Sequence, residues 1–273
     1  MPTRVTALVP AWNSESFIGR TLDSLASQTY PSLRVLISDD ASTDGTAEIC
    51  EHLAGRDARF SVIRQPANLG WIGNANFLLA RAESEYCFFG FHDDIFAPDY
   101  VLQLARRLDG NQKAAIAYSD LHVMDPSGRC RAATYARYDG VGDPVERARI
   151  VILREDDWWL PIHGLYRTAA VRDAGFLRRH ILGEFSADWS WLVRMALCGE
   201  FARTSLPLST KVLRKESVAA QWAFPPRLWY SLAFSCAGGV LGARLRARDK
   251  LILWQELAKF CRSCRREAKG LER

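Results

Sequence analysis

The first hundred residues of the chain alternate between short apolar runs and segments with helical spacing, and this alternation restricts the fold most. Runs rich in β-branched and aromatic residues predict strands at residues 5–9, 33–38, 60–64 and 86–91. The segments between them predict helices at residues 17–26, 46–53 and 73–82. Strands that alternate with helices pair in parallel and are wrapped by those helices. We therefore predict an α/β fold.

The remainder of the chain has a looser pattern. Helices are predicted at residues 98–108, 168–174 and 186–197, and extended segments at 114–118, 121–124, 165–166 and 206–213. Residues 126–150 are rich in Gly, Asp, Arg and Pro and are expected to be irregular. From residue 221 the chain becomes aromatic and then basic with helical spacing. We predict one α/β domain over residues 1–220 and a C-terminal helical extension over 221–273.

The net charge of +5 is concentrated near the C-terminus. Residues 244–273 contain ten basic and four acidic side chains, so the rest of the chain is close to neutral. That balance argues against a nucleic-acid-binding protein. Three roles remain open for the basic segment: it packs on the domain, it joins two copies of the chain, or it lies on an anionic membrane surface.

Cysteine usage and hydropathy indicate a cytoplasmic protein. The seven cysteines are irregularly spaced, so no disulfide framework is expected. The apolar run at residues 228–243 is shorter than the roughly 20 residues that span a bilayer. The N-terminus has no signal-peptide pattern. We expect a cytoplasmic protein whose basic segment is a candidate contact with the inner face of the membrane.

Pairs of acidic residues follow two of the predicted strands. Ligands of parallel sheets bind at the carboxyl ends of the strands, where Asp39-Asp40 and Asp93-Asp94 lie. Adjacent carboxylates repel each other unless a cation such as Mg²⁺ or Mn²⁺ binds them. Two alternatives stay open: Asp94 or Asp99 caps the next helix, and Asp39-Asp40 belongs to an Asx-turn instead of contacting a nucleotide.

A further carboxylate begins the strongest predicted helix. Asp188 lies in the first turn of the helix at residues 186–197, where it either complements the helix dipole or faces the site as a general base. Rival carboxylates are Glu184, Asp156 and Asp157, and the sequence does not rank them.

Taken in order, these segments resemble the inverting family 2 glycosyltransferases, which have the GT-A fold. The resemblance covers roughly residues 4 to 215 and runs through segments 5–15, 17–31, 36–46, 68–70 with Asn76, 92–98 and 187–194. It implies a mostly parallel central sheet flanked by helices. A Rossmann-like nucleotide-sugar half would span residues 1–98, and an acceptor half residues 99–220.

The resemblance also implies roles for individual residues. Asp188 would deprotonate the acceptor hydroxyl, and Asp39 would meet the uracil ring if the donor is a UDP-sugar. Asp93 and Asp94 would hold ribose, diphosphate and Mn²⁺ or Mg²⁺, with Asp94 as the first choice of metal ligand. The other implied contacts are to the donor from Pro10, Trp12, Glu15, Asp40, Asn76 and Arg214, and to the acceptor from His163.

The chain departs from the family pattern at two places. Phe91 stands where the metal motif usually has its first Asp, so His92 becomes either a ligand, a hydrogen-bond donor or an ordinary polar residue. Ala187 replaces the Glu that often precedes the base. Arg214 and Lys215 either clamp the diphosphate or are ordinary solvated residues.

The implied reaction moves a sugar from a nucleoside diphosphate to a saccharide or lipid-linked acceptor, in the synthesis of a cell-surface polysaccharide or glycolipid. The missing acidic residue of the metal motif supports one alternative, a non-catalytic sugar-nucleotide-binding module. A nucleotidyltransferase would need a Gly-rich basic loop, which residues 10–15 lack. The oligomeric state stays open.

Overall fold

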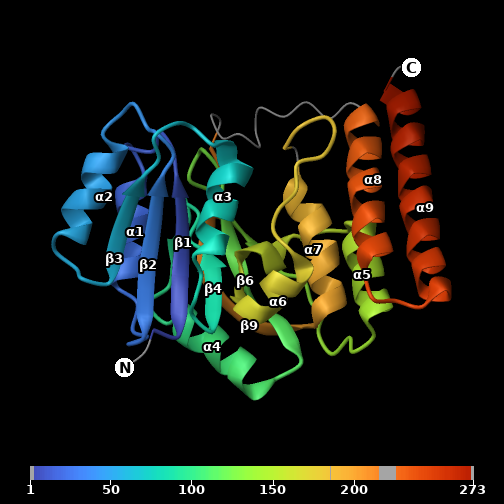
Figure 1. Cartoon of the computed structure of the whole chain (residues 1–273), viewed down its shortest axis with the longest axis horizontal. Coiled ribbons are helices and arrows are strands. Elements are labelled where there is room, and N and C mark those ends of the chain that lie inside the picture. Colours follow the sequence, from blue (N-terminus) through green and yellow to red (C-terminus); the bar gives the residue numbers. More distant parts are fainter. Residues whose placement is uncertain (1–2, 185, 215–225, 272–273) are drawn as a thin grey trace.

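A computed structural model describes residues 3–184, 186–214 and 226–271 of the chain (Figure 1). Its centre is one nine-stranded sheet with the order β3-β2-β1-β4-β8-β6-β9-β5, and β7 pairs with β6 outside this path. The sheet is continuous across the two predicted halves of the domain. The predicted boundary at residue 221 lies outside the described residues.

The first half of the sheet is parallel, as predicted. Its elements are β1 (Val5–Ala11), α1 (Ile18–Ala26), β2 (Leu33–Asp39), α2 (Thr46–Ala54), β3 (Phe60–Arg64), α3 (Gly70–Ala80) and β4 (Tyr86–Phe89). β1 pairs in parallel with both β2 and β4, and β2 with β3. The carboxyl ends of these strands therefore meet at one edge, where both acidic pairs lie.

The second half of the sheet is mixed, so the prediction of a mostly parallel sheet holds only for the first half. β8 runs antiparallel to both β4 and β6, β9 is parallel to β6, and β5 is antiparallel to β9. The elements here are β5 (Ile95–Phe96), α4 (Tyr100–Gly110), β6 (Ala114–Met124), a 3₁₀ turn η1 (Leu160–His163), β8 (Leu165–Arg167), α6 (Thr168–Ala174), α7 (Ala187–Cys198) and β9 (Glu200–Val212).

Two sequence predictions in this half are wrong. The two predicted strands at 114–118 and 121–124 form the single strand β6, which stays paired with β9 through register shifts around Asp120. The irregular excursion at 126–150 contains β7 (Cys130–Ala133) and α5 (Pro144–Leu153). Asp143 caps α5 by accepting from the backbone N–H groups of Val145 and Glu146. This Asp-Pro start is a helix signal that the sequence analysis overlooked.

The sheet is covered on both faces, which explains why its central strands are almost uniformly apolar. Val5, Ala7 and Val9 of β1 belong to the core shared with α1, α2 and α4. Leu8 points to the other face, where the core includes residues of α3 and α5 to α9. Two cores thus fix the sheet, and the strand ends remain free to form a site.

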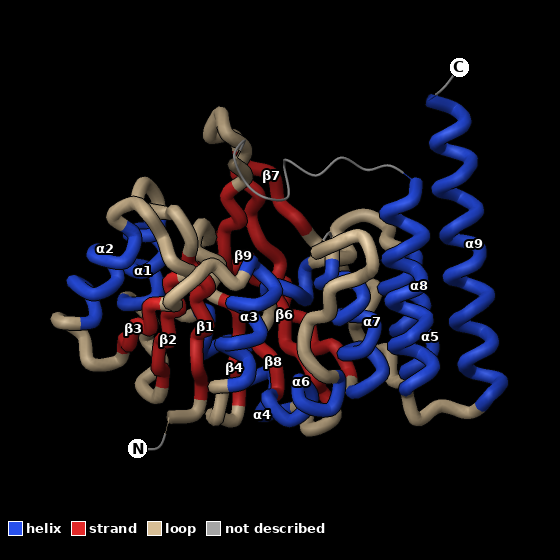
Figure 2. The backbone as a smooth tube through the Cα atoms, turned by 45° about the horizontal axis from the view of Figure 1, so that its top comes forward, coloured by secondary structure: helices blue, strands red, loops and turns tan. Residues whose placement is uncertain are grey.

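The C-terminal extension is helical, as predicted. It consists of α8 (Pro226–Gly242) and α9 (Ala247–Leu271), which lie side by side at the end of the molecule farthest from β3 (Figure 2). α8 packs on α7 and α9 on α5, and the rings of Trp189 and Phe260 lie 4.8 Å apart. Within the described residues, no helix, including α8 and α9, is long and apolar enough to cross a bilayer.

Candidate active site

The loops after β1 and β2 are joined by hydrogen bonds into one rim at the carboxyl edge of the sheet. The N–H of Asn13 donates to Ser42 Oγ over 2.9 Å, and its side-chain oxygen accepts from the N–H of Thr43 over 2.9 Å. One carboxylate oxygen of Glu15 accepts from the N–H of Gly45 over 2.9 Å. Asn13 has φ of 42°, a left-handed conformation that Asn tolerates better than most residues. The rim is therefore pre-formed.

Three residues of this rim were predicted to meet the nucleotide. Glu15 serves the rim itself, because its carboxylate holds the second loop. Pro10 is partly exposed near the end of β1. Trp12 is 46% exposed, which leaves its indole free to stack on a planar ring. Their roles toward a donor remain predictions.

Asp39 and Asp40 are both buried, and their carboxylates differ in their hydrogen-bond partners. Asp40 Oδ1 accepts from the N–H of Leu69 over 2.7 Å, which ties the end of β2 to the start of α3. Burial raises the pKa of Asp40, although backbone hydrogen bonds from Leu69 and Gly70 offset part of that rise. Asp39 Oδ2 accepts from the N–H of Ser42 over 3.3 Å, while its buried Oδ1 has no partner among the described residues. Asp39 therefore has an oxygen left for a ligand.

Asn76, predicted to bind the donor, uses its side chain elsewhere. Its amide nitrogen donates to the carbonyl of Leu177 over 2.9 Å, and its oxygen accepts from the N–H of Leu177 over 3.0 Å. Both polar ends of the amide are thus occupied by one backbone position. In this structure Asn76 fixes the segment that leads toward α7.

Asp94 is the most buried carboxylate at the edge, with 1% of the residue exposed. Its Oδ2 accepts from Nδ1–H of His163 over 2.8 Å, and its buried Oδ1 has no partner within the described residues. Burial acts to raise the pKa of Asp94, but the charges of His163 and Lys211 and hydrogen bonds outweigh it, so the pKa lies below its ordinary value. Asp94 is therefore ionised, with one oxygen available.

The capping alternative for this pair finds no support in the structure. α4 begins at Tyr100 after Asp99, and the side chain of Asp99 caps no backbone N–H. It accepts instead from the side chain of Gln103 over 3.0 Å. Asp94 lies five residues earlier and bonds to His163.

His163 was predicted to line the acceptor cleft, and in the structure it is buried and bonded to Asp94. Only 5% of the residue is exposed. The rings of Phe91 and Trp159 lie 5.1 and 5.2 Å from the imidazole. A buried ring N–H needs an acceptor, and Asp94 supplies it. His163 thus orients Asp94.

His92 is enclosed as well. Its ring lies 5.2 Å from the ring of Phe17, and its buried Nδ1 has no partner among the described residues. Burial lowers its pKa and outweighs the opposing effect of Asp93. The side chain is therefore a neutral imidazole, and its two predicted roles, metal ligand and hydrogen-bond partner, stay open.

Gly164 sets how closely the turn carrying His163 approaches β6. A Cβ at this position would lie 2.5 Å from the carbonyl oxygen of Ala117 and 2.9 Å from a side-chain carbon of Ile116. Because backbone must move to admit it, we expect Gly164→Ala to lower the free energy of unfolding by about 1–3 kcal/mol in urea unfolding. Gly110→Ala, whose Cβ would meet nothing within 4 Å, is the control. Equal stability of the two variants would contradict this close approach.

Lys211 of β9 was missed by the sequence analysis. Its ammonium lies 5.9 Å from the ring centroids of both Phe91 and Trp159. Its charge helps to lower the pKa of Asp94 and offsets part of the rise in the pKa of Asp188. Alternation along an extended segment was the available signal, but sequence alone does not show which face of β9 meets the site.

Asp188 starts α7 and is half-buried. Burial raises its pKa above the ordinary value, and the charges of Arg154 and Lys211 offset part of that rise. Two rival carboxylates are engaged by arginines: Asp157 with Arg131 at 2.9 Å and Glu184 with Arg179 at 2.6 Å. Asp188 is the predicted base whose environment matches that role.

Arg214 lies near the mouth of the site. Its guanidinium carbon is 3.3 Å from the centroid of the Phe17 ring, and its charge contributes to lowering the pKa of His92. A stacked guanidinium keeps its N–H groups available for an anion. Its partner in the predicted clamp, Lys215, lies outside the described residues.

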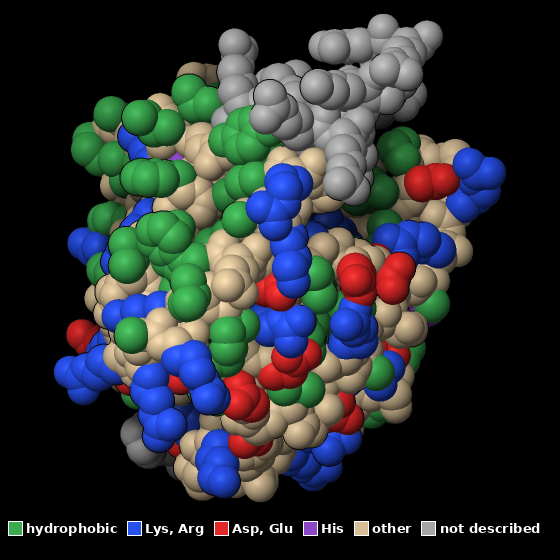
Figure 3. Space-filling view, turned by 90° about the vertical axis from the view of Figure 1, so that its right-hand side faces the viewer, with side chains coloured by type: hydrophobic (Ala, Val, Ile, Leu, Met, Phe, Trp, Pro, Cys, Tyr) green, Lys and Arg blue, Asp and Glu red, His purple; other side chains and the backbone are tan. Residues whose placement is uncertain are grey.

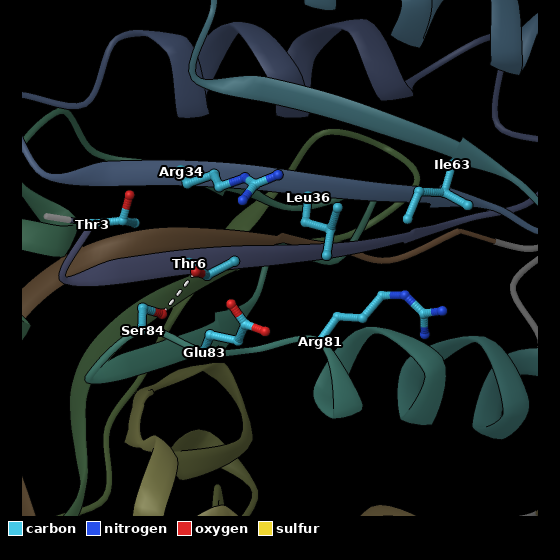
Figure 4. Close-up of a pocket in the computed structure, with 8 residues that line it drawn as sticks. All are labelled: Thr3, Thr6, Arg34, Leu36, Ile63, Arg81, Glu83 and Ser84. Carbon is cyan, nitrogen blue, oxygen red and sulfur yellow. Dashed lines mark hydrogen bonds between the residues drawn. The ribbon is translucent and has the colours of Figure 1, made fainter.

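A separate groove of about 420 Å³ lies on the sheet face near the start of β1 and β2 (Figure 4). Thr6, Arg34, Leu36 and Arg81 are among its lining residues, and Thr6 bonds to Ser84 over 2.7 Å. None of the predicted site residues lines it. The groove is therefore distinct from the acidic edge.

The carboxylates of the acidic edge suit a divalent cation that also binds a ligand. The described part of the chain contains no group of three or more His, Cys, Asp or Glu side chains placed to hold a metal. Mg²⁺ and Mn²⁺ sites in nucleotide enzymes commonly use one or two carboxylates plus substrate phosphates. The unpartnered Oδ1 of Asp94 and the neighbouring Asp93 suit that arrangement.

The curled sheet with its acidic edge places the protein in the GT-A class of α/β folds. The structure of Staphylococcus aureus TarS 1–349 in complex with UDP-GlcNAc superposes with a TM-score of 0.76 at 21% identity, over 94% of this chain and 72% of that one. The mannosyltransferase PcManGT from Pyrobaculum calidifontis, in complex with GDP-Man and Mn²⁺, gives 0.62 at 16% identity, over 99% and 76%. The predicted GT-A fold is confirmed.

The chain belongs to glycosyl transferase family 2, whose model matches residues 6–165. It is 32% identical over 124 residues to glycosyltransferase GlyA of Streptococcus pneumoniae, covering 45% of this chain and 18% of GlyA. It is 30% identical over 115 residues to the putative teichuronic acid biosynthesis glycosyltransferase TuaG of Bacillus subtilis, covering 42% of this chain and 44% of TuaG. The matches thus span less than half the length of these relatives.

Proposed function

We propose that the protein is an inverting glycosyltransferase that moves a sugar from a nucleoside-diphosphate donor, with UDP-sugar favoured, to an acceptor hydroxyl. The product would be a cell-surface polysaccharide or glycolipid. Family membership supports the reaction class. The UDP-GlcNAc bound by TarS and the teichuronic acid pathway in the name of TuaG favour the donor and the product class.

One observation carries the proposal: Lys211 lies beside the aromatic rings that flank the Asp94–His163 pair, and its charge also acts on a second carboxylate, Asp188. Asp94 follows β4 in the nucleotide half, and Asp188 begins α7 in the acceptor half. The charge of Lys211 helps to lower the pKa of Asp94 and offsets part of the rise that burial causes in the pKa of Asp188. We infer that the ionised Asp94 and the proposed base Asp188 border a common space, as transfer between two substrates requires.

Each side chain has a distinct task in the proposed reaction. Asp94, held by His163, and Asp93 would bind Mn²⁺ or Mg²⁺ together with the donor diphosphate. When bound, the cation supplies Lewis-acid stabilisation of the departing diphosphate. The Mn²⁺ in the PcManGT complex supports this choice of cofactor. Asp93 brings a negative charge to the edge and Lys211 a positive one. The ammonium of Lys211 would stabilise the negative charge of the departing diphosphate without any reorganisation of the protein.

The base completes the bond exchange. Asp188 accepts the proton of the acceptor hydroxyl while the oxygen of that hydroxyl bonds to the anomeric carbon. The bond from that carbon to the diphosphate oxygen breaks, and the electron pair leaves with the diphosphate. Attack opposite to the leaving group inverts the anomeric configuration. A pKa raised above the ordinary carboxylate value makes Asp188 a stronger base than an ordinary carboxylate.

Replacement of Lys211 would test its two proposed effects, on the rate of sugar transfer and on the pKa of Asp188. We expect Lys211→Met to slow sugar transfer about 10–100-fold, because a preorganised positive charge is lost beside the leaving group. The acid limb of the pH–rate profile should move to higher pH, since Lys211 lowers the pKa of Asp188. Lys211→Arg keeps the charge and should shift the limb less. If the acid limb of the pH–rate profile stays unchanged in Lys211→Met, Lys211 does not act on the base.

The proposal is tested by measuring melting temperatures with UDP-, GDP- and dTDP-sugars, each with and without Mn²⁺, followed by nucleotide release in the presence of candidate acceptors. We expect a metal-dependent rise with one nucleotide and acceptor-dependent release of that nucleotide. Binding without release under any acceptor or hydrolysis condition would instead support the non-catalytic sugar-nucleotide-binding module. Absence of both binding and release would overturn the proposal.

A further inference from the structure

From Leu228 to its end, α8 carries no charged side chain. No Asp, Glu, Lys or Arg occurs between Leu228 and Ala243. Tyr230, Phe234 and Leu241 are exposed at spacings of four and seven residues, which places them on one side of the helix. Phe234 is 80% exposed. A surface helix normally presents polar residues on this side, whereas α8 exposes apolar side chains to water there.

The neighbouring helix α9 continues the apolar surface. Leu251 and Trp254 are exposed three residues apart, whereas Leu253 and Leu257 are buried against the domain. The two helices pack against each other as a hairpin. Each helix therefore has one apolar side in the protein core and further apolar side chains exposed on the hairpin surface.

A tight turn ahead of α7 adds two more exposed aliphatic side chains. His180 and Gly183 exchange backbone hydrogen bonds of 2.9 Å, which leaves Ile181 and Leu182 at the tip. Ile181 is 89% exposed. The ring of His180 lies 2.8 Å from Ser231 Oγ and so fixes the turn to α8 beside Tyr230. We call the exposed side chains of these three elements the apolar face: Ile181, Leu182, Tyr230, Phe234, Leu241, Leu251 and Trp254.

Basic side chains accompany the apolar face. Residues 244–263 contain six Lys or Arg and two acidic residues. One of those acids, Glu256, is buried and accepts from Lys259 over 2.9 Å, whereas the side chain of Arg248 is 83% exposed. Figure 3 shows hydrophobic side chains gathered on one side of this end of the molecule, with Lys and Arg side chains below them. The hairpin surface is thus apolar and positively charged.

We propose that the apolar face and its basic border dock the protein on an anionic lipid membrane, in the plane of the interface. Exposed aromatic and aliphatic side chains next to Lys and Arg are the pattern of interfacial helices. A second copy of the chain suits this surface less well, because a two-fold contact would bring the two basic borders together. Within the described residues no helix is long and apolar enough to cross a bilayer.

Docking on this surface would also orient the site, a consequence that rests on the proposed function. The turn at residues 180–183 lies five residues before Asp188, and α8 packs on α7, the helix that Asp188 begins. The acceptor side of the site would then be held close to the lipid surface. An acceptor hydroxyl carried by a membrane lipid is the class of substrate that this arrangement favours.

Vesicle flotation tests the docking without requiring any activity. We expect the full chain to float with vesicles of phosphatidylglycerol and phosphatidylcholine, and to float less with phosphatidylcholine alone or in high salt. Phe234→Glu and Ile181→Glu should each reduce the bound fraction about tenfold or more, because an exposed apolar anchor becomes charged. Leu206→Glu, an exposed leucine of β9 outside the apolar face, is the matched control. Melting temperatures check that each variant is folded.

The possible outcomes separate the two proposals. A full chain that stays at the bottom with anionic vesicles overturns the docking, as does flotation that Phe234→Glu and Ile181→Glu leave unchanged. A dimer that Phe234→Glu converts to a monomer, without flotation, assigns the apolar face to a second copy and also overturns it. Since flotation needs no donor, its failure would leave the transfer reaction untouched, and loss of transfer would leave the docking untouched.

Discussion

Asp188→Asn is expected to reduce the turnover number for sugar transfer about 10²–10⁴-fold, the usual contribution of a positioned general base. Donor binding should change little, because Asp188 begins α7 in the predicted acceptor half while the proposed donor ligands follow β2 and β4. The amide oxygen of Asn can still accept from the N–H of Trp189, which Asp188 Oδ1 holds at 3.0 Å. Initial rates of nucleotide release at saturating donor measure the effect.

The fold of this variant should be preserved. The folded-state pKa of Asp188 is raised, mainly by burial, so its ionisation disfavours the folded state at pH above that pKa. Asn removes the charge, and Asp188→Asn should melt no lower than the parent protein near neutral pH. Glu184→Gln is the control, since Glu184 pairs with Arg179. A large loss in Glu184→Gln, with little loss in Asp188→Asn, would reassign the base.

The pH profile gives an independent reading of the same residue. Transfer should fall as pH decreases through the pKa of Asp188, which lies above the ordinary 3.8. Asp94 has a lowered pKa and stays ionised in that range. The acid limb should therefore report the base and not the metal ligand. Donor binding that persists across the limb, while turnover falls, is the expected signature.

The fold could be predicted because its signals are local. Apolar runs of strand length, helical spacing and turn residues located β1 to β4 with their helices within a few residues. Prediction of the second half of the sheet failed where strand pairing between residues far apart in the sequence decides the structure. The continuity of β6 depends on β9, about 85 residues later, and the antiparallel placement of β8 depends on β4. No local pattern encodes either.

The site could be predicted only in part, for the same reason. Strand ends located Asp39 and Asp94 by position, whereas Asp188 begins a helix and was selected as the candidate base by the family resemblance. The partner of Asp94 is His163, 69 residues away in sequence, and its turn is set by the contact of Gly164 with β6. Lys211 reaches the site from β9. A lone His or Lys carries no sequence signal of this kind, because its function depends on what the fold brings beside it.

Asp94→Asn is expected to abolish the metal-dependent stabilisation by nucleotide. For the parent protein, donor at 100 times its dissociation constant adds about 2.7 kcal/mol to the free energy of unfolding. That corresponds to a rise of roughly 5–10 °C in melting temperature for a chain of this size. Asn preserves the volume and an acceptor for His163 but removes the charge from Oδ1, the oxygen that has no partner in the described structure. The rise with nucleotide and Mn²⁺ should disappear.

Two companion variants test whether the metal-dependent stabilisation by nucleotide depends on Oδ1 of Asp94. Asp93→Asn should retain part of the rise if Asp93 contributes a second oxygen, and all of it if Asp94 alone binds the cation. Asp99→Asn should retain all of it, because its carboxylate bonds to Gln103. A full rise in Asp94→Asn would contradict the metal site, and the ammonium of Lys211 would then be the group that neutralises the diphosphate. In that case Lys211→Met should abolish the stabilisation that Asp94→Asn leaves intact.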